Sequence, residues 1–341
     1  MRSTLSPPVD ASGRSAGDQV EDGQNAGKDR SGAVDLTIAR HVPWSKRLRR
    51  DRTMLLLVLP GFLYFVVFHY VPLLGNVIVF KDYQPYLGIQ GSPWVGLDNF
   101  QIFKDPEFLS ALGNTVKFAL IQLVLFFPAP IGLALMLNSL VGTKVRRFVQ
   151  SVVYLPHFIG WVILVSIAQQ LLGGAGLVPH LLGSLGLPQV DVMSSEGFFP
   201  WLLALQVIWK DAGWGTIIYL AAILNIDQEQ YEAAAIDGAN RWRRLWHVTL
   251  PGLMPVTILL FILNLGTILS VGFEQILLQR DAVGAGASEV LDTYVYIHGV
   301  VDGDWGTSAA VGLAKGVVGL AMILGANKLA HRLGHDGVYQ R

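Results

Sequence analysis

Six long apolar segments recur along this 341-residue chain, and they restrict its fold more than any other feature. A helix crosses the hydrocarbon core of a bilayer with about 20 mostly apolar residues, because each residue advances it by about 1.5 Å. Within lipid, only helices and closed barrels satisfy the backbone hydrogen bonds. The pattern therefore predicts an all-α polytopic membrane protein with six transmembrane helices, at about residues 54–80, 112–137, 148–172, 198–224, 255–278 and 307–329.

Composition agrees with a membrane protein and argues against other classes. Hydrophobic residues make up 52% of the chain and charged residues only 15%, whereas soluble domains carry about 25% charged residues. Mean hydropathy is +0.46. The formal net charge is zero, with 25 basic and 25 acidic side chains, so the charge balance indicates no nucleic-acid partner.

The sequence lacks the residues that several kinds of chemistry require. It has no cysteine, which excludes disulfides, thiolate metal sites and a cysteine nucleophile. The eight histidines do not have the spacing of a metal site, and no Gly-x-x-x-x-Gly-Lys-Ser/Thr loop for phosphate occurs. We therefore expect no catalytic residue, metal or cofactor in this chain, so that any ATP driving it is hydrolysed by another subunit.

Basic residues gather in alternate polar stretches of the chain. They lie in the run Lys46–Arg52, at residues 144–147, at residues 241–244 and near the C-terminus, whereas the intervening loops are mainly acidic. The positive-inside rule places all four clusters, and thus both termini, in the cytoplasm.

Three regions follow from this pattern. Residues 1–45 are polar and nearly free of aromatic side chains, which predicts a disordered cytoplasmic tail. The tail has no apolar core, so we do not expect it to be a signal peptide. Residues 46–332 are expected to form the membrane domain, and residues 333–341 a cytoplasmic C-terminal tail.

A polar segment at residues 225–251 separates two of the apolar runs. Residues 232–235 are strong helix formers, and Gly238 is suited to end a helix. A second short amphipathic helix is predicted after this glycine. Pro251 is expected to close the segment, because proline does not continue a helix.

The order Glu-Ala-Ala-x-x-Asp-Gly-Ala, followed by Leu-Pro, resembles the cytoplasmic EAA loop of ABC importer permeases. The matching residues are Glu232, Ala233, Ala234, Asp237, Gly238, Ala239, Leu250 and Pro251. In that family the loop is a coupling helix that docks into a cleft on a separate ATPase subunit. The resemblance implies a type I ABC importer permease architecture, in which Glu232 and Asp237 position and cap this helix and Gly238 permits its turn. The alternative is a surface amphipathic helix between two spans.

Residues 81–85 and 91–100 are similar to the first outer loop of the polysaccharide and oligosaccharide branch of these permeases. The alternative for their aromatic side chains is anchoring at the membrane interface. The resemblance implies a carbohydrate solute and a bacterial cell membrane location. It also implies three partners, which are a second permease subunit, an ATPase dimer and an extracytoplasmic solute-binding lipoprotein.

Charged residues interrupt three of the apolar runs. Lys210 and Asp211 fall in the fourth, Glu274 in the fifth and Lys315 in the sixth. Each charge costs about 2.5–3.5 kcal/mol or more at this depth unless it faces a partner or a wet cavity.

Two interpretations of these charges stay open, a solute pathway and an internal salt bridge such as Lys315 with Glu274. For the pathway, we expect Lys210 and Lys315 to face a shared cavity between two permease chains, because neither has an obvious partner on its own helix. Adjacent residues on a helix do not face each other, so Lys210 and Asp211 are not expected to pair. Such a cavity suits hydroxyl-rich solutes and favours uronic acids. Nearby aromatic residues that could contact sugars are Trp209, Trp214 and Tyr219.

Two other functions are alternatives to carbohydrate import. One is an importer of the same fold for a different solute. The other is an ion-coupled secondary transporter that uses Lys210, Asp211 or Glu274 as a proton relay, which would leave the EAA-like segment unexplained. His157 is expected to be a packed residue that faces the helix bundle.

Overall fold

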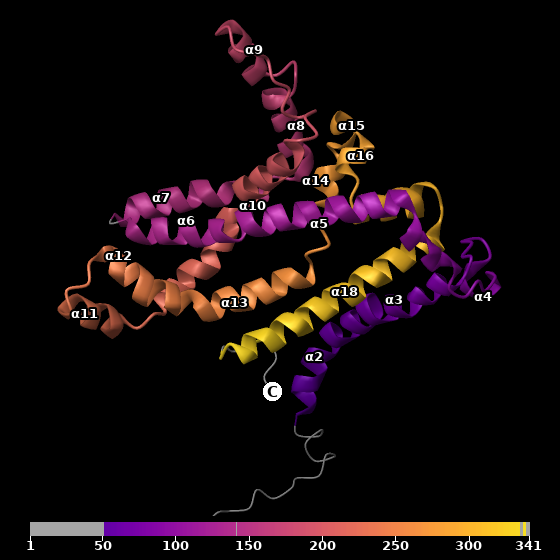
Figure 1. Ribbon diagram of the computed structural model, residues 1–341. Helices are drawn as coiled ribbons and strands as arrows, with labels where there is room; N and C mark the ends of the chain where they lie inside the picture. The colour runs from indigo at the N-terminus through magenta and orange to yellow at the C-terminus, as the bar shows by residue number, and fades with distance from the viewer. Residues whose placement is uncertain (1–50, 141, 335–336, 339–341) are drawn as a thin grey trace, which may run out of the picture. The chain divides into compact units, whose positions relative to one another are not determined.

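The computed structural model describes residues 51–140, 142–334 and 337–338 (Figure 1). The chain divides after Tyr64 into two compact units. The predictions for the tail at residues 1–45, for Lys46–Arg50 of the basic run and for most of the C-terminal tail concern residues outside the described part.

Six helices in the described ranges are long and apolar enough to cross a membrane. They are Arg52–Phe80, Pro106–Ser139, Trp161–Ser184, Phe199–Leu224, Arg241–Gly266 and Trp305–Arg332. The same ranges contain one isolated antiparallel bridge, between Lys81 and Trp94, and otherwise helices and loops. The predicted all-α class with six spans is confirmed.

The first two spans are built from consecutive helical pieces, in which η denotes a 3₁₀ or π turn. The first contains α2 (Arg52–Phe65), η1 (Val66–Tyr70), α3 (Val71–Leu74) and η2 (Gly75–Phe80). The loop after it holds α4 (Gly88–Gly91) and η3 (Asp98–Lys104). The second span contains α5 (Pro106–Phe126) and α6 (Pro128–Ser139). Prolines begin α5 and α6, where their missing N–H is tolerated.

The predicted third span at residues 148–172 is wrong as one continuous helix. The chain there forms α7 (Thr143–Tyr154), η4 (Leu155–Phe158), α8 (Trp161–Leu172) and α9 (Leu177–Ser184). The break between η4 and α8 falls at Ile159 and Gly160, whose backbone is extended. Pro156 and Gly160 both disfavour a continuous helix, so the candidate span begins only at Trp161.

The predicted fifth span at residues 255–278 is also displaced. Its helix, α13 (Leu250–Gly266), ends well before residue 278. Gly272 then takes a left-handed conformation, with φ of 56°, ahead of the separate helix α14 (Phe273–Leu277). Only glycine adopts this conformation without cost, so the chain leaves the first helix direction here.

Helix α10 (Phe199–Leu224) is the central element of the second unit and packs against α5, α6, α7, η4 and α13. Small residues allow the close approach. A Cβ atom added at Gly213 would lie 2.1 Å from the carbonyl oxygen of Val153, so only glycine fits. Thr216 donates to the carbonyl oxygen of Pro130 at 3.2 Å. Such contacts through small residues are typical of helices packed in membranes.

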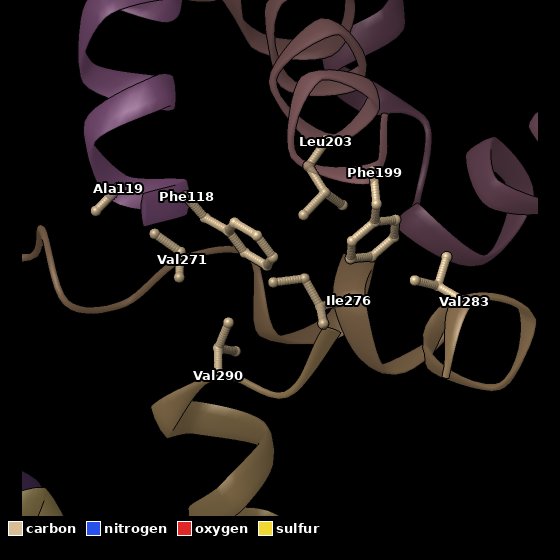
Figure 2. Close-up of a cluster of buried hydrophobic side chains, with 8 residues drawn as sticks. All are labelled: Phe118, Ala119, Phe199, Leu203, Val271, Ile276, Val283 and Val290. Carbon is tan, nitrogen blue, oxygen red and sulfur yellow. The ribbon is translucent and has the colours of Figure 1, made fainter. Parts of the chain in front are cut away.

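A buried apolar cluster surrounds the beginning of α10 (Figure 2). It joins α5 and α10 to the segment that follows the break at Gly272. Its members are Phe118, Ala119, Phe199, Leu203, Val271, Ile276, Val283 and Val290. The cluster fixes this segment, which continues through α15 (Arg280–Val283), α16 (Ala285–Ser288), α17 (Leu291–Val295) and η6 (Tyr296–Val301) to α18 (Trp305–Arg332).

Hydrogen bonds also tie α5 to this late segment. Asn114 donates to the carbonyl oxygens of Gly286 and Glu289, both at 3.0 Å. The hydroxyl of Thr115 accepts from the N–H of Leu291 at 2.9 Å. The second span and the segment before the sixth are therefore held together by polar as well as apolar contacts.

Candidate functional site

The segment at residues 225–251 contains a short helix with well-formed ends. Helix α11 (Gln228–Ile236) begins after Asp227, whose carboxylate accepts from the N–H of Glu229 at 3.0 Å. This is the usual role of an N-cap residue. The predicted cap, Asp237, instead follows the last turn, so the first turn is capped by a residue that the sequence reasoning missed. An Asp immediately before a run of helix formers is the signal that would have identified it.

Gly238 ends this helix in the left-handed region, as the sequence predicted. Its φ is +74°, and the N–H of Ala239 bonds back to the carbonyl oxygen of Ala234 at 2.9 Å. A Cβ atom at Gly238 would meet nothing within 4 Å. The requirement for glycine here is therefore conformational rather than steric.

The chain after the turn runs into the fifth span without a break. Asn240 caps α12 (Arg241–Arg244) by accepting from the N–H of Arg243 at 2.9 Å. The π turn η5 (Leu245–Thr249) then leads directly into α13. The expectation that Pro251 closes the segment is wrong. Pro251 lies in the first turn of α13, and the wider π turn before it relieves the clash that a proline causes in a regular α-helix.

Most residues of the EAA-like motif lie at the surface. Glu232, Ala233, Asp237, Gly238 and Pro251 are exposed, and Ala234, Ala239 and Leu250 are half-buried. Ile236 is 88% exposed, which is unusual for a large aliphatic side chain. The hydroxyl of Tyr231 lies 3.0 Å from that of Thr249 and ties α11 to the start of the fifth span. This surface therefore presents small and apolar residues on a helix that is attached to a span.

The charges predicted within the fourth span form a cluster around the break before α8. Lys210 is 8% exposed, and its ammonium donates to the carbonyl oxygen of His157 at 2.7 Å. The same ammonium lies 5.6 Å from the centre of the Trp161 ring, as in cation–π contacts. Lys210 therefore satisfies a backbone carbonyl that the break leaves without a helical partner.

Asp211 completes this cluster through His157. Its carboxylate lies 2.8 Å from Nδ1 of His157 and 3.8 Å from the ammonium of Lys210. The expectation that Lys210 and Asp211 do not pair is wrong, because both side chains turn toward the same residue, Lys210 to the carbonyl of His157 and Asp211 to its imidazole. The imidazole stacks on Trp214 with 4.6 Å between ring centres. His157 is thus a connected residue of the cluster.

Lys315 forms a separate pair and does not meet Lys210. Its ammonium bonds to the carboxylate of Asp292 in α17, and both side chains are mostly buried. The suggested partner Glu274 is exposed, and its carboxylate forms no hydrogen bond or ion pair with a described residue. Each lysine therefore has a carboxylate within the chain, and the two do not face one cavity within it.

The aromatic residues of the predicted pathway are not brought together either. Trp209 and Trp214 are both exposed, whereas Tyr219 is buried in a different cluster with Ala134, Ile223 and Leu253. Of these three residues, Trp214 is the one that contacts the charged cluster, through the imidazole of His157.

Sequence reasoning missed two polar features. Lys117 is an exposed charge in the second span. Gln206, Gln275 and Gln279 are buried and share hydrogen bonds of 2.6–3.1 Å between α10 and the segment after Gly272. Gln206 lies four residues before Lys210, on the same face of α10. This face therefore contacts both the third span, at the break before α8, and the segment that follows the fifth span. Polar residues at this spacing in an apolar helix were the available signal.

In the described ranges no group of three or more histidine or acidic side chains could hold a metal ion. Several of the chain's polar side chains instead bond with one another, as in the cluster of Lys210, Asp211 and His157. The arrangement resembles a membrane scaffold with an exposed helical attachment point.

Comparison with known proteins gives consistent relationships. Residues 126–335 match the family described as binding-protein-dependent transport system inner membrane component. The chain is 43% identical to protein LplB of Bacillus subtilis, over 89% of this chain and 96% of the relative. It is 45% identical to the polygalacturonan/rhamnogalacturonan transport system permease protein YteP of the same organism, over 86% and 92%.

A solved structure has the same fold. It is the crystal structure of a bacterial alginate ABC transporter in complex with an alginate pentasaccharide-bound periplasmic protein. One of its chains is similar with a TM-score of 0.80 and 34% identity, over 86% of this chain and 99% of that chain. A second crystal structure, of a bacterial ABC transporter involved in the import of the acidic polysaccharide alginate, gives a TM-score of 0.78 and 35% identity.

Proposed function

We propose that this chain, which belongs to the family of binding-protein-dependent transport system inner membrane components, is the permease subunit of an ATP-driven carbohydrate importer. The observation that carries the proposal is the likeness, at a TM-score of 0.80 and 34% identity, to a chain of an alginate importer. The likeness covers 86% of this chain and 99% of that chain.

The proposed solute is an oligosaccharide that carries carboxylates. One relative is named for polygalacturonan and rhamnogalacturonan transport, and the similar solved structures concern alginate, described as an acidic polysaccharide. The paired lysines of this chain do not themselves support the uronate preference, because Lys210 and Lys315 are each balanced by a carboxylate. The proposal for the solute class therefore rests on the relatives.

The proposed partners are a second permease subunit, an ATPase dimer and an extracytoplasmic binding protein. Helix α11 would dock on the ATPase through its exposed surface around Ala233 and Ile236. Because α12, η5 and α13 are continuous, a displacement of α11 would pass through Gly238 and the Tyr231–Thr249 contact into the fifth span. This arrangement supports alternating access coupled to ATP binding and hydrolysis.

The chain itself is proposed to make or break no bonds, to bind no cofactor and to leave ATP hydrolysis to the ATPase. We propose that both termini and the residue 225–251 segment lie in the cytoplasm. Cysteines introduced singly at the exposed residues Ser184 and Asn240 test this orientation, since the natural chain has none. An impermeant thiol reagent added outside should label the first and not the second, and the reverse pattern would overturn the orientation.

The function is tested by uptake into proteoliposomes that contain this chain with its second permease, ATPase and binding protein. Labelled oligogalacturonate should accumulate only with internal ATP, and a neutral glucose oligomer of equal length is the matched solute. Uptake that needs a proton gradient and continues without ATPase would identify a secondary transporter. ATP-driven uptake of the neutral oligomer alone would retain the importer and reject the acidic solute.

A further inference from the structure

A cavity of about 320 Å³ lies between the end of α6 and the α12–η5 helix. Its lining residues are Leu135, Asn138, Ser139, Tyr231, Arg241, Trp242, Arg244, Leu245 and Thr249. The candidate spans Pro106–Ser139 and Arg241–Gly266 end and begin at this cavity. The cavity therefore lies where two spans reach the boundary between lipid and water.

The cavity is positively charged. Arg241 and Arg244 line it, and no acidic residue does. Neither guanidinium forms an ion pair with a carboxylate in the described part of the chain, and Nε of Arg244 is buried without a hydrogen-bond partner there. A buried unpaired donor on a charged group is costly, so the site favours an anion that accepts from this guanidinium.

The polar wall adds hydrogen-bond donors of suitable kind. Arg146 donates to the side-chain oxygen of Asn138 at 3.3 Å, which leaves the amide NH₂ of Asn138 as the free donor. A second cavity of about 280 Å³ shares Asn138, Tyr231 and Arg244 with the first. Arg244 thus lies between two hollows, and an anion held by it would touch both α6 and the residue 225–251 segment.

The apolar wall and the position indicate the source of the anion. Leu135, Leu245 and Trp242 form one side of the cavity, and Trp242 and Trp246 are both largely exposed. Exposed tryptophans at the end of a span are typical of the headgroup region. Arginine matches a phosphate with two parallel hydrogen bonds.

We propose that this cavity binds the phosphate of an anionic phospholipid, with Arg244 as the main ligand and Arg241 as the second. The glycerol part lies against Leu135, Leu245 and Trp242. The bound lipid then bridges the second span, the fifth span and α11. The proposal concerns lipid binding and stands independently of the transported solute.

The test uses the assembled importer purified from a membrane that contains phosphatidylglycerol, and measures retained lipid by native mass spectrometry. Arg244→Gln and Arg241→Gln should each reduce retained phosphatidylglycerol about tenfold, as expected for a lost charge-assisted hydrogen bond. Arg243→Gln is the matched control. It removes the same charge from the same helix, but Arg243 does not line the cavity, so retention should stay within about twofold.

Three results would overturn the proposal. The first is equal retention of phosphatidylcholine and phosphatidylglycerol by the importer in nanodiscs that contain the two lipids in equal amounts. The second is release of the retained phosphatidylglycerol by inorganic phosphate alone, which would indicate a site for free phosphate. The third is loss of the ATPase subunit, with lipid unchanged, in Arg244→Gln, which would mean that a carboxylate of the ATPase occupies the cavity. Arg244→Lys, which keeps the charge, controls for folding and should retain an intermediate amount of lipid.

Discussion

Two polar regions of this chain satisfy their groups in opposite ways. Around α10, Lys210, Asp211 and His157 pair with one another, and the three glutamines share their hydrogen bonds internally. In the residue 225–251 segment, Glu232 and Asp237 are exposed, and Arg241 and Arg244 have no carboxylate partner in the described chain. The internal region therefore holds interrupted spans in place, and the segment presents groups that other molecules can satisfy.

This difference separates stability from coupling. Removing a partner within the α10 cluster leaves a charge or carbonyl unsatisfied in an apolar region, which destabilises the fold. Changing the segment alters an attachment surface whose partners lie outside the chain.

The largest stability effect is expected at Lys210. Lys210→Met leaves the carbonyl of His157 and the carboxylate of Asp211 without their cation, so we expect a loss of about 2–3 kcal/mol in unfolding free energy. Unfolding in detergent–denaturant mixtures measures it, and Lys210→Met with Asp211→Asn should recover about half, since both charges are then gone. Loss of uptake with unchanged stability would instead place Lys210 in the solute pathway.

The largest effect on coupling is expected at Gly238. A β-branched residue in the left-handed region costs about 1–2 kcal/mol, so Gly238→Val should lower uptake about tenfold while membrane insertion is unchanged. Gly186 has the same φ of +74° and equally open surroundings but lies in a different loop. Gly186→Val therefore carries the same strain and should keep near-normal uptake. Equal losses in both variants would contradict a special role for the residue 225–251 turn.

A smaller loss of stability is expected at the pair of Lys315 and Asp292. Asparagine keeps a side-chain oxygen that can accept from the Lys315 ammonium, whereas Lys210→Met removes the donor altogether, so Asp292→Asn should cost about 1–2 kcal/mol rather than the larger value at Lys210. Glu274→Gln is the control, because Glu274 is exposed and unpaired in the described chain. Should Glu274→Gln be the more destabilising of the two, the assignment of the pair would be incorrect.

The smallest effect is expected at the N-cap of α11. Asp227→Ala removes the acceptor for the N–H of Glu229, which costs about 1 kcal/mol of local helix stability. ATPase stimulation by solute-loaded binding protein should fall a few-fold, with global unfolding unchanged. Asp227→Ser restores a cap and should restore stimulation, whereas failure of this rescue would show that the carboxylate acts by another route.

Local signals in the sequence were sufficient for the class, the number of spans and the glycine turn. Apolar length identified the spans, and Gly238 marked a turn that does need a left-handed residue. The breaks at Gly160 and Gly272 were missed because apolar composition continues across them. Hydropathy measures the environment of a residue and not the continuity of its helix.

The partners of the charged residues could not be predicted, because they are distant in sequence. Asp211 meets His157 from 54 positions earlier, and Lys315 meets Asp292 from 23 positions earlier. Helix geometry alone predicts that the neighbouring Lys210 and Asp211 do not pair. In the structure both side chains turn toward His157, which brings them together. Which residue pairs with each charge depends on tertiary packing, and spacing along one helix does not encode that packing.

The bonds from Asn114 and Thr115 to the late segment also affect how the protein is made. The ribosome adds Gly286 172 residues after Asn114, roughly 10–30 s later at usual rates of synthesis. Throughout that interval the second span, although already made, lacks the acceptors and the donor with which it finally bonds. Its final place in the bundle is therefore reached only near the end of translation, and until then the insertion machinery or another membrane component must shelter its polar face.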